Sequence, residues 1–88
     1  MKTGLPGKHW MDTDGLHIDV RDLEPPGPMV AILGQIDQPG QSGPITVHHD
    51  RQPVYLFPEL AERGWTCTQI PGDPDDPDEI RLLMVAKA

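Results

Sequence analysis

The sequence has a single cysteine, few aromatic residues and no long apolar run. Its one thiol, Cys67, excludes a disulfide within these 88 residues and the cysteine-rich class of metal site. Residues 1–15 hold glycine, proline and charged side chains without an apolar stretch, so we expect neither a signal peptide nor a membrane anchor there. These absences predict a soluble cytoplasmic protein.

Basic residues are also scarce. Seven lysines and arginines stand against fourteen aspartates and glutamates, which gives a formal net charge of −7. A field of that sign repels nucleic-acid phosphates and anionic lipids, so we expect neither nucleic acid nor a membrane as a partner. A protein, a neutral small molecule or a cation stays open as the partner, and the charge also favours solubility.

The chain divides into a tail and one domain. Residues 1–14 carry Gly4, Pro6 and Gly7 without a periodic apolar pattern, which predicts a flexible N-terminal tail. Residues 15–88 show regular apolar spacing and are long enough for one domain only.

Apolar spacing predicts four strands in this domain. They are expected at residues 16–20, 45–48, 65–70 and 79–87. In the first of them apolar and polar residues alternate, which is the period of a half-buried strand. The last is apolar on both sides, so we expect it inside the sheet, with Leu83 and Val85 on a partly apolar open face.

Two helices are expected between these strands. The first has one apolar stripe with helical spacing, formed by Met29, Ile32, Leu33 and Ile36. Prolines immediately before it suit a helix start, because the first amides of a helix have no partner within it. The second helix buries Leu56 and Leu60 and ends at Gly64. Pro58 within it predicts either a start near Phe57 or a kinked helix with a loose first turn.

The resulting order β-α-β-α-β-β predicts an α+β two-layer sandwich. Its sheet is mixed and four-stranded, with both helices on one face. Residues 71–78 are rich in proline and aspartate but lack the spacing of a calcium-binding loop, so we expect a solvated hairpin loop there.

Three segments resemble a known family. Residues 18–28, which read Ile-Asp-Val-Arg-Asp-Leu-Glu-Pro-Pro-Gly-Pro, resemble the TusA/SirA group of small sulfur-carrier proteins, whose first strand runs into a Cys-Pro-x-Pro motif at a helix start. Residues 49–53 and 56–65 are similar to an uncharacterised bacterial branch of that group. The resemblance covers about residues 16–87, and it implies the same sandwich fold and a setting in sulfur or redox metabolism.

The carrier cysteine of that group has no counterpart in this chain. Pro25 stands in its position, and a proline has no nucleophile. In the carriers, a thiolate at a helix start is stabilised by the positive end of the helix dipole. We therefore expect a helix start without its sulfur chemistry, and a non-catalytic binding or adaptor domain without a cofactor.

The candidate ligand-binding edge joins the first helix start to the segment after the second strand. It comprises Glu24, Pro25, Pro26, His49, Asp50, Arg51 and Tyr55. Helix starts and an arginine suit an anion or a small molecule. The structural alternative is that Asp50 caps the second helix while Arg51 pairs with Asp22 or Glu24.

Two other function classes stay open. His48, His49 and Asp50 are adjacent metal-ligand types, with His17 expected on the neighbouring strand, but successive strand residues point to opposite faces. Cys67 is the only thiol for sulfur transfer or redox chemistry, yet a position inside a strand offers no helix start or cation to activate it. We expect Cys67 in the core or on an inert surface.

Overall fold

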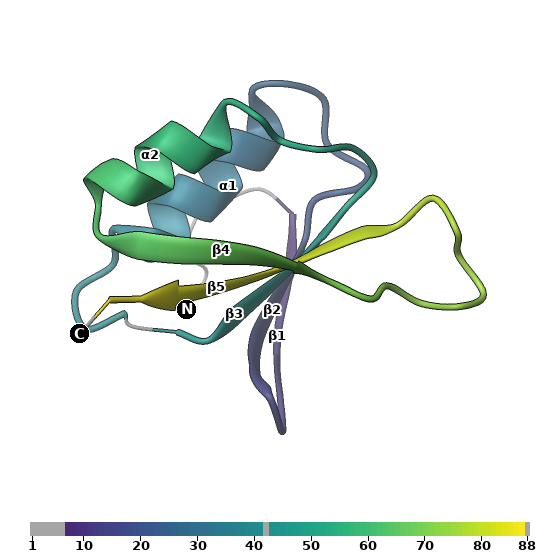
Figure 1. Ribbon diagram of the computed structural model, residues 1–88, viewed down its shortest axis with the longest axis horizontal. Coiled ribbons are helices and arrows are strands. Elements are labelled where there is room, and N and C mark those ends of the chain that lie inside the picture. The colour runs from purple at the N-terminus through teal and green to yellow at the C-terminus, as the bar shows by residue number, and fades with distance from the viewer. Residues whose placement is uncertain (1–6, 42, 88) are drawn as a thin grey trace.

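The computed structural model describes residues 7–41 and 43–87, which form one sheet with two helices. The elements in chain order are β1 (Lys8–Asp12), β2 (Gly15–Asp19), α1 (Gly27–Ile36), β3 (Ile45–His49), α2 (Leu56–Glu62), β4 (Trp65–Ile70) and β5 (Ile80–Ala86). Both helices lie on the same face of the sheet (Figure 1). The predicted α+β class is confirmed.

The sheet is mixed and its strand order is β1-β2-β3-β5-β4. β2 and β3 are parallel neighbours connected through α1. β5 lies between β3 and β4 and is antiparallel to both, so this strand is internal, as its apolar residues on both faces predict.

The expected four-stranded sheet is wrong by one strand. Residues 8–12, which we expected in a flexible tail, form β1 and pair antiparallel with β2, from Lys8 opposite Asp19 to Asp12 opposite Gly15. β1 is an edge strand in which every residue but His9 is exposed, so it lacks the alternation that marks a half-buried strand. Residues 1–6 of the expected tail lie outside the described residues.

The apolar core fills the space between the sheet and the helices. Its most deeply buried side chains come from both layers and include Ile18, Ile32, Val47, Leu60 and Met84, each under 2% exposed. Because side chains alternate along a strand, the residues between these core positions point to the face without helices. No helix in the described part of the chain is long and apolar enough to span a membrane.

The helix ends follow the local sequence, with one exception. Pro28 lies in the first turn of α1, and Gly64, with φ of 75°, comes directly after the C-cap Arg63 of α2 as predicted. The expectation that Asp50 caps α2 is wrong. Its N-cap is Tyr55, without a side-chain cap, because the intervening residues form turns before the helix begins.

Candidate functional site

A cavity of about 250 Å³ opens between the start of α1, the end of β3 and the segment that leads to α2. Ile32 and Leu56, both buried, line it, and so do three prolines at the start of α1. Pro25, Pro26 and Pro28 therefore form one wall of the cavity. Their rings restrict the backbone in the segment that connects β2 to α1.

Five of the seven residues predicted from the sequence line this cavity. They are Pro25, Pro26, His49, Arg51 and Tyr55. Glu24 and Asp50 do not line it, although each is adjacent in the chain to residues that do. The structure thus brings together the prolines at the start of α1 and the segment after β3.

His49 is the last residue of β3 and the most enclosed polar group of the cavity, with a side chain 4% exposed. Its Nδ1 lies 2.9 Å from the backbone nitrogen of Asp50 and 3.3 Å from that of Arg51. Both amides donate, so Nδ1 accepts and the ring proton sits on Nε2. Burial lowers the pKa of His49, although Asp50 favours the charged form, so the ring is a neutral donor near pH 7.

The Nε2 of His49 belongs to a side chain that lines the cavity. Nε2 has no hydrogen-bond partner among the described residues, and in that part of the chain no fully buried side-chain nitrogen or oxygen lacks one. His49 is thus the buried N–H donor of a cavity whose other polar lining side chains, Arg51, Gln52 and Tyr55, are exposed.

Arg51 and Tyr55 stand at the rim. The side chain of Arg51 is 65% exposed, and its Nε lies 3.4 Å from Oδ1 of Asp50. The expected pairing of Arg51 with Asp22 or Glu24 is not formed, and Asp22 lies near Lys8 instead. Tyr55 is 78% exposed, so both side chains are available to a molecule that enters the cavity.

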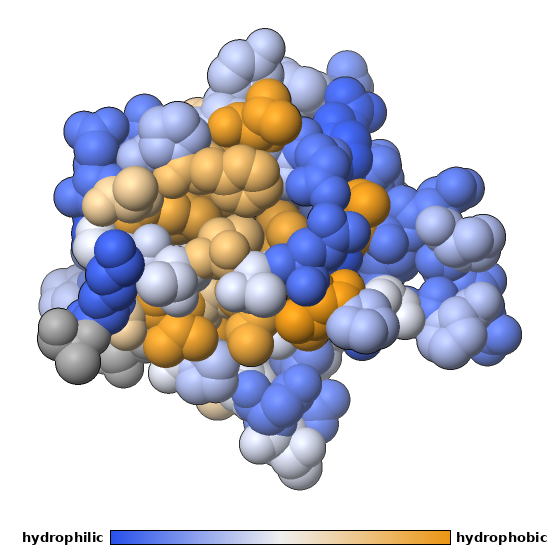
Figure 2. Space-filling view, viewed as in Figure 1, coloured by the Kyte–Doolittle hydropathy of each residue, from blue (hydrophilic) through white to orange (hydrophobic). Residues whose placement is uncertain are grey.

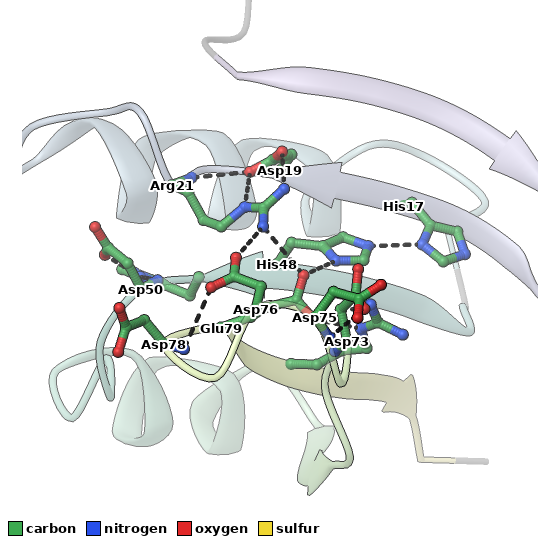
Figure 3. A network of polar contacts seen from close by, with 12 residues as sticks. His17, Asp19, Arg21, His48, Asp50, Asp73, Asp75, Asp76, Asp78 and Glu79 are labelled. Carbon is green, nitrogen blue, oxygen red and sulfur yellow. Dashed lines mark hydrogen bonds and ion pairs between the residues drawn. The ribbon is translucent and has the colours of Figure 1, made fainter.

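A second group of polar side chains lies on the face without helices (Figure 3). His17 Nδ1 and His48 Nε2 are 2.8 Å apart, and His48 Nδ1 lies 3.0 Å from Oε2 of Glu79. At the other end His17 Nε2 lies 2.6 Å from Oδ1 of Asp14. Trp10 from β1 stacks on both imidazoles, which are therefore buried on an outer face of the sheet.

Hydrogen bonding lowers the pKa of the two carboxylates at the ends of this row. The pKa of Asp14 is lowered by its hydrogen bond to His17. Burial opposes ionisation of Glu79, but His48, the Asp73 amide and Arg81 outweigh it and its pKa is also lowered. Each of the four imidazole nitrogens between these carboxylates has a hydrogen-bond partner within the row.

Arg21 joins this row to the loop between β4 and β5. Its guanidinium donates to Asp19 at 2.8 Å, to Asp76 at 2.9 Å and to Glu79 at 3.3 Å. The carboxylate of Glu79 is 2% exposed and also accepts from Arg81. The expectation of a merely solvated hairpin loop is therefore wrong at Asp76, which binds Arg21 together with Glu79 at the end of the loop.

The residues of the alternative metal site do not converge in the structure. His48 lies on the face without helices and His49 on the helix-facing side, so these two and Asp50 do not converge on one point. Asp12, Asp14 and His17 do offer ligand atoms within 4.8 Å of one another, but both carboxylates are exposed and one is hydrogen-bonded to His17.

Cys67, the residue of the alternative sulfur-transfer function, is half-buried against the core, and burial raises the pKa of its thiol.

Apolar surface is not confined to the cavity. Figure 2 shows apolar side chains gathered on the side of the molecule where α2, β4 and β5 lie in Figure 1. Phe57 and Val85 are each 37% exposed. Phe57 belongs to α2, whereas Val85 was expected on the face without helices, and each is a surface that a binding experiment must distinguish from the cavity.

Sequence reasoning missed Trp10 and Glu79. Trp10 was placed in the tail, and its edge strand carries no periodic signal. Glu79 follows four aspartates in a proline-rich loop, and nothing in the sequence separates the one buried carboxylate from its exposed neighbours.

Comparison with known proteins gives a family but no described relative. A family model described as "Uncharacterized conserved protein (DUF2249)" matches residues 17–84, from β2 to β5. No curated protein and no solved structure matches the chain.

Proposed function

Since the chain belongs to the DUF2249 family of uncharacterised conserved proteins, we propose that it is a non-catalytic binding domain for a small molecule, with the cavity beside His49 as its site. One observation carries this proposal: the prolines at the start of α1, the buried histidine His49 and the exposed Arg51 line the same cavity. The cavity has a volume of about 250 Å³ and a mostly apolar lining. Small-molecule sites typically combine an apolar lining with a few convergent polar groups.

The cavity lining favours binding over covalent chemistry. It includes no cysteine, serine, threonine or carboxylate, so among the lining residues there is no activated nucleophile of the usual kinds. Pro25, which by resemblance takes the position of the cysteine in the sulfur carriers, is one of the apolar residues that line the cavity. The function we infer is retention of a ligand rather than transfer of sulfur.

We also propose kinship with the TusA/SirA group, in a bacterial cytoplasm and in sulfur or redox metabolism. Support comes from the segment that leads into α1, from the similarity of residues 49–53, and from the arrangement of two helices on one face of a mixed sheet. This kinship is an argument by resemblance and assigns no ligand.

The test is a titration of the full chain with a set of soluble small molecules of varied charge, followed by backbone amide chemical shifts. We expect the largest shifts at residues that line the cavity, such as His49 and Leu56. Met29→Trp, which places a larger side chain at the lining, should abolish them. Val30→Trp is the matched control, because Val30 is 49% exposed on the same helix and does not line the cavity.

Thermal melts of both variants show whether they are folded. Shifts confined to the open face around Leu83 and Val85, or binding that Met29→Trp leaves intact, would contradict the proposed site.

A further inference from the structure

We propose that the ligand of this cavity is a small monocarboxylate with an apolar body, held by the Nε2–H of His49 and the guanidinium of Arg51. The inference rests on the proposed binding function and adds the chemical class of the ligand. The cavity lining combines an N–H donor and a positive charge, which are close in the chain, with mostly apolar side chains.

The polarity of the lining is one-sided. The chain has twice as many acidic as basic residues, yet no carboxylate lines the cavity. Its polar lining residues besides His49 and Arg51 are Gln52 and Tyr55, and the amide of Gln52 already donates to Gln69. An acidic protein that excludes carboxylates from one cavity provides a place where an anionic group avoids repulsion.

His49 supplies a fixed hydrogen-bond donor. Two backbone amides hold its Nδ1 as an acceptor, which fixes both the tautomer and the direction of Nε2–H. The carboxylate of Asp50 lies 3.2 Å from Nδ1, on the opposite side of the ring from Nε2. A ligand oxygen at Nε2 would therefore meet the donor and not the Asp50 carboxylate.

Arg51 supplies the charge. Its only ion-pair partner among the described residues is Asp50, reached through Nε at 3.4 Å, so the two terminal NH₂ groups stay available for a bidentate contact. The start of α1 adds a smaller contribution of the same sign. Its ten residues have no side-chain cap and no acidic residue in the first turn, so the positive end of the helix is not neutralised locally.

The remaining lining selects the body of the ligand. Leu23, Met29, Ile32 and Leu56 offer no hydrogen bonds from their side chains, so a sugar or a nucleotide would lose hydration there without replacement. An apolar cavity of about 150 Å³ holds benzene. The roughly 250 Å³ available here suits a body of about phenyl size together with one carboxylate.

The experiment compares three molecules of one shape in the full chain: phenylacetate, its neutral amide phenylacetamide, and the cation 2-phenylethylamine. Amide chemical shifts give a dissociation constant for each, and ¹⁵N shifts of the histidine rings report the state of His49. We expect phenylacetate to bind at the cavity at least tenfold more tightly than phenylacetamide, and the amine not to bind. Phenylacetate should also shift the Nε2 resonance of His49.

Two variants assign the contacts. His49→Phe keeps a ring but removes the donor, and it should reduce the preference for phenylacetate over its amide to about threefold or less. Arg51→Gln should weaken phenylacetate about tenfold and leave phenylacetamide unchanged. Arg63→Gln is the matched control, because Arg63 binds Asp37 and Glu59 away from the lining, and it should change neither constant. If His49→Phe does not fold, the Nε2 shift in the unaltered chain decides the role of His49.

Each outcome bears on one of the two proposals. Equal binding of phenylacetate and phenylacetamide at the cavity would overturn the carboxylate class and leave the proposed binding function intact. Preference for the amine, or an unmoved Nε2 resonance on phenylacetate binding, would also overturn it. Failure of all three probes while other small molecules shift the lining residues would overturn the ligand class alone, whereas no shifts at the cavity with any compound would overturn the binding function as well.

Discussion

His48 Nδ1 lies 3.0 Å from Oε2 of Glu79, and both side chains are buried on the face of the sheet that has no helices. The two residues are 31 positions apart in the chain. Their contact fixes the loop between β4 and β5 to the centre of the sheet, because β3 is paired on both sides. A carboxylate in this position is worth testing directly.

Replacing Glu79 by Gln should destabilise the protein by roughly 2–4 kcal/mol, because a buried carboxylate is lost while His48, Arg21 and Arg81 keep their donors and charge. Urea unfolding at pH 7 measures this change. Asp75→Asn is the control, since Asp75 is exposed in the same loop, and it should change the free energy of unfolding by less than about 0.5 kcal/mol. Equal costs for the two variants would mean that the loop is not held through Glu79.

Acid should weaken the contribution of His49. Its pKa is lowered in the folded state by burial, so the unfolded chain takes up the proton first as the pH falls. The stability that depends on neutral His49 is thus fully present above its ordinary pKa of 6.5 and is lost as the pH falls from there through the lowered folded pKa. The difference in unfolding free energy between the unaltered chain and His49→Gln, which does not titrate, should be constant above about pH 7.5 and decrease below 6.5. A difference that grows on acidification would show that the folded protein favours the charged ring.

The helices and four of the strands were predictable because their apolar residues recur with the period of a helix or a strand, even in β3, where all five residues are buried. Such elements show their period in the sequence, as in the stripe that α1 turns toward the sheet. β1 was missed because almost all of its residues are exposed, so its position is set by pairing with β2 and not by burial.

The sequence predicted the parts of the candidate site whose residues are close together in the chain. It did not predict the contacts between residues that are far apart in the chain. The prolines before α1 and the residues after β3 were expected at one edge, and the cavity collects five of the seven. Asp50 points elsewhere, since adjacent residues at a strand end face different sides. The row His17, His48 and Glu79 depends on strand register and on the path of a loop, and neither can be read from local spacing.

Trp10 offers a test of the strand that the sequence did not show. Its ring stacks on His17 and His48 with centroids 5.2 and 5.3 Å away, and it is 39% exposed. Trp10→Ala should cost roughly 1–3 kcal/mol, because it removes this stacking and opens the buried imidazoles to water. Met11→Ala, at a neighbouring position that is 73% exposed, should cost less than about 0.5 kcal/mol. Unfolding curves of both variants decide the matter, and a Trp10→Ala cost as small as that of Met11→Ala would mean that β1 does not pack on β2 in solution.

Cys67 should behave as a packing residue and not as a sulfur carrier. It lies on β4 opposite Met84 of β5, half-buried against the core, and burial raises the pKa of its thiol. Less thiolate and restricted access both slow nucleophilic attack, so iodoacetamide at pH 7.5 should alkylate Cys67 at least about tenfold more slowly than free cysteine. The same thiol in concentrated urea is the internal control and should react at the rate of free cysteine. Cys67→Ser should leave binding at the cavity unchanged, because Cys67 does not line it. A native thiol that outpaces free cysteine, or one that retains a persulfide after desalting, would favour the sulfur-transfer function over the binding function proposed above.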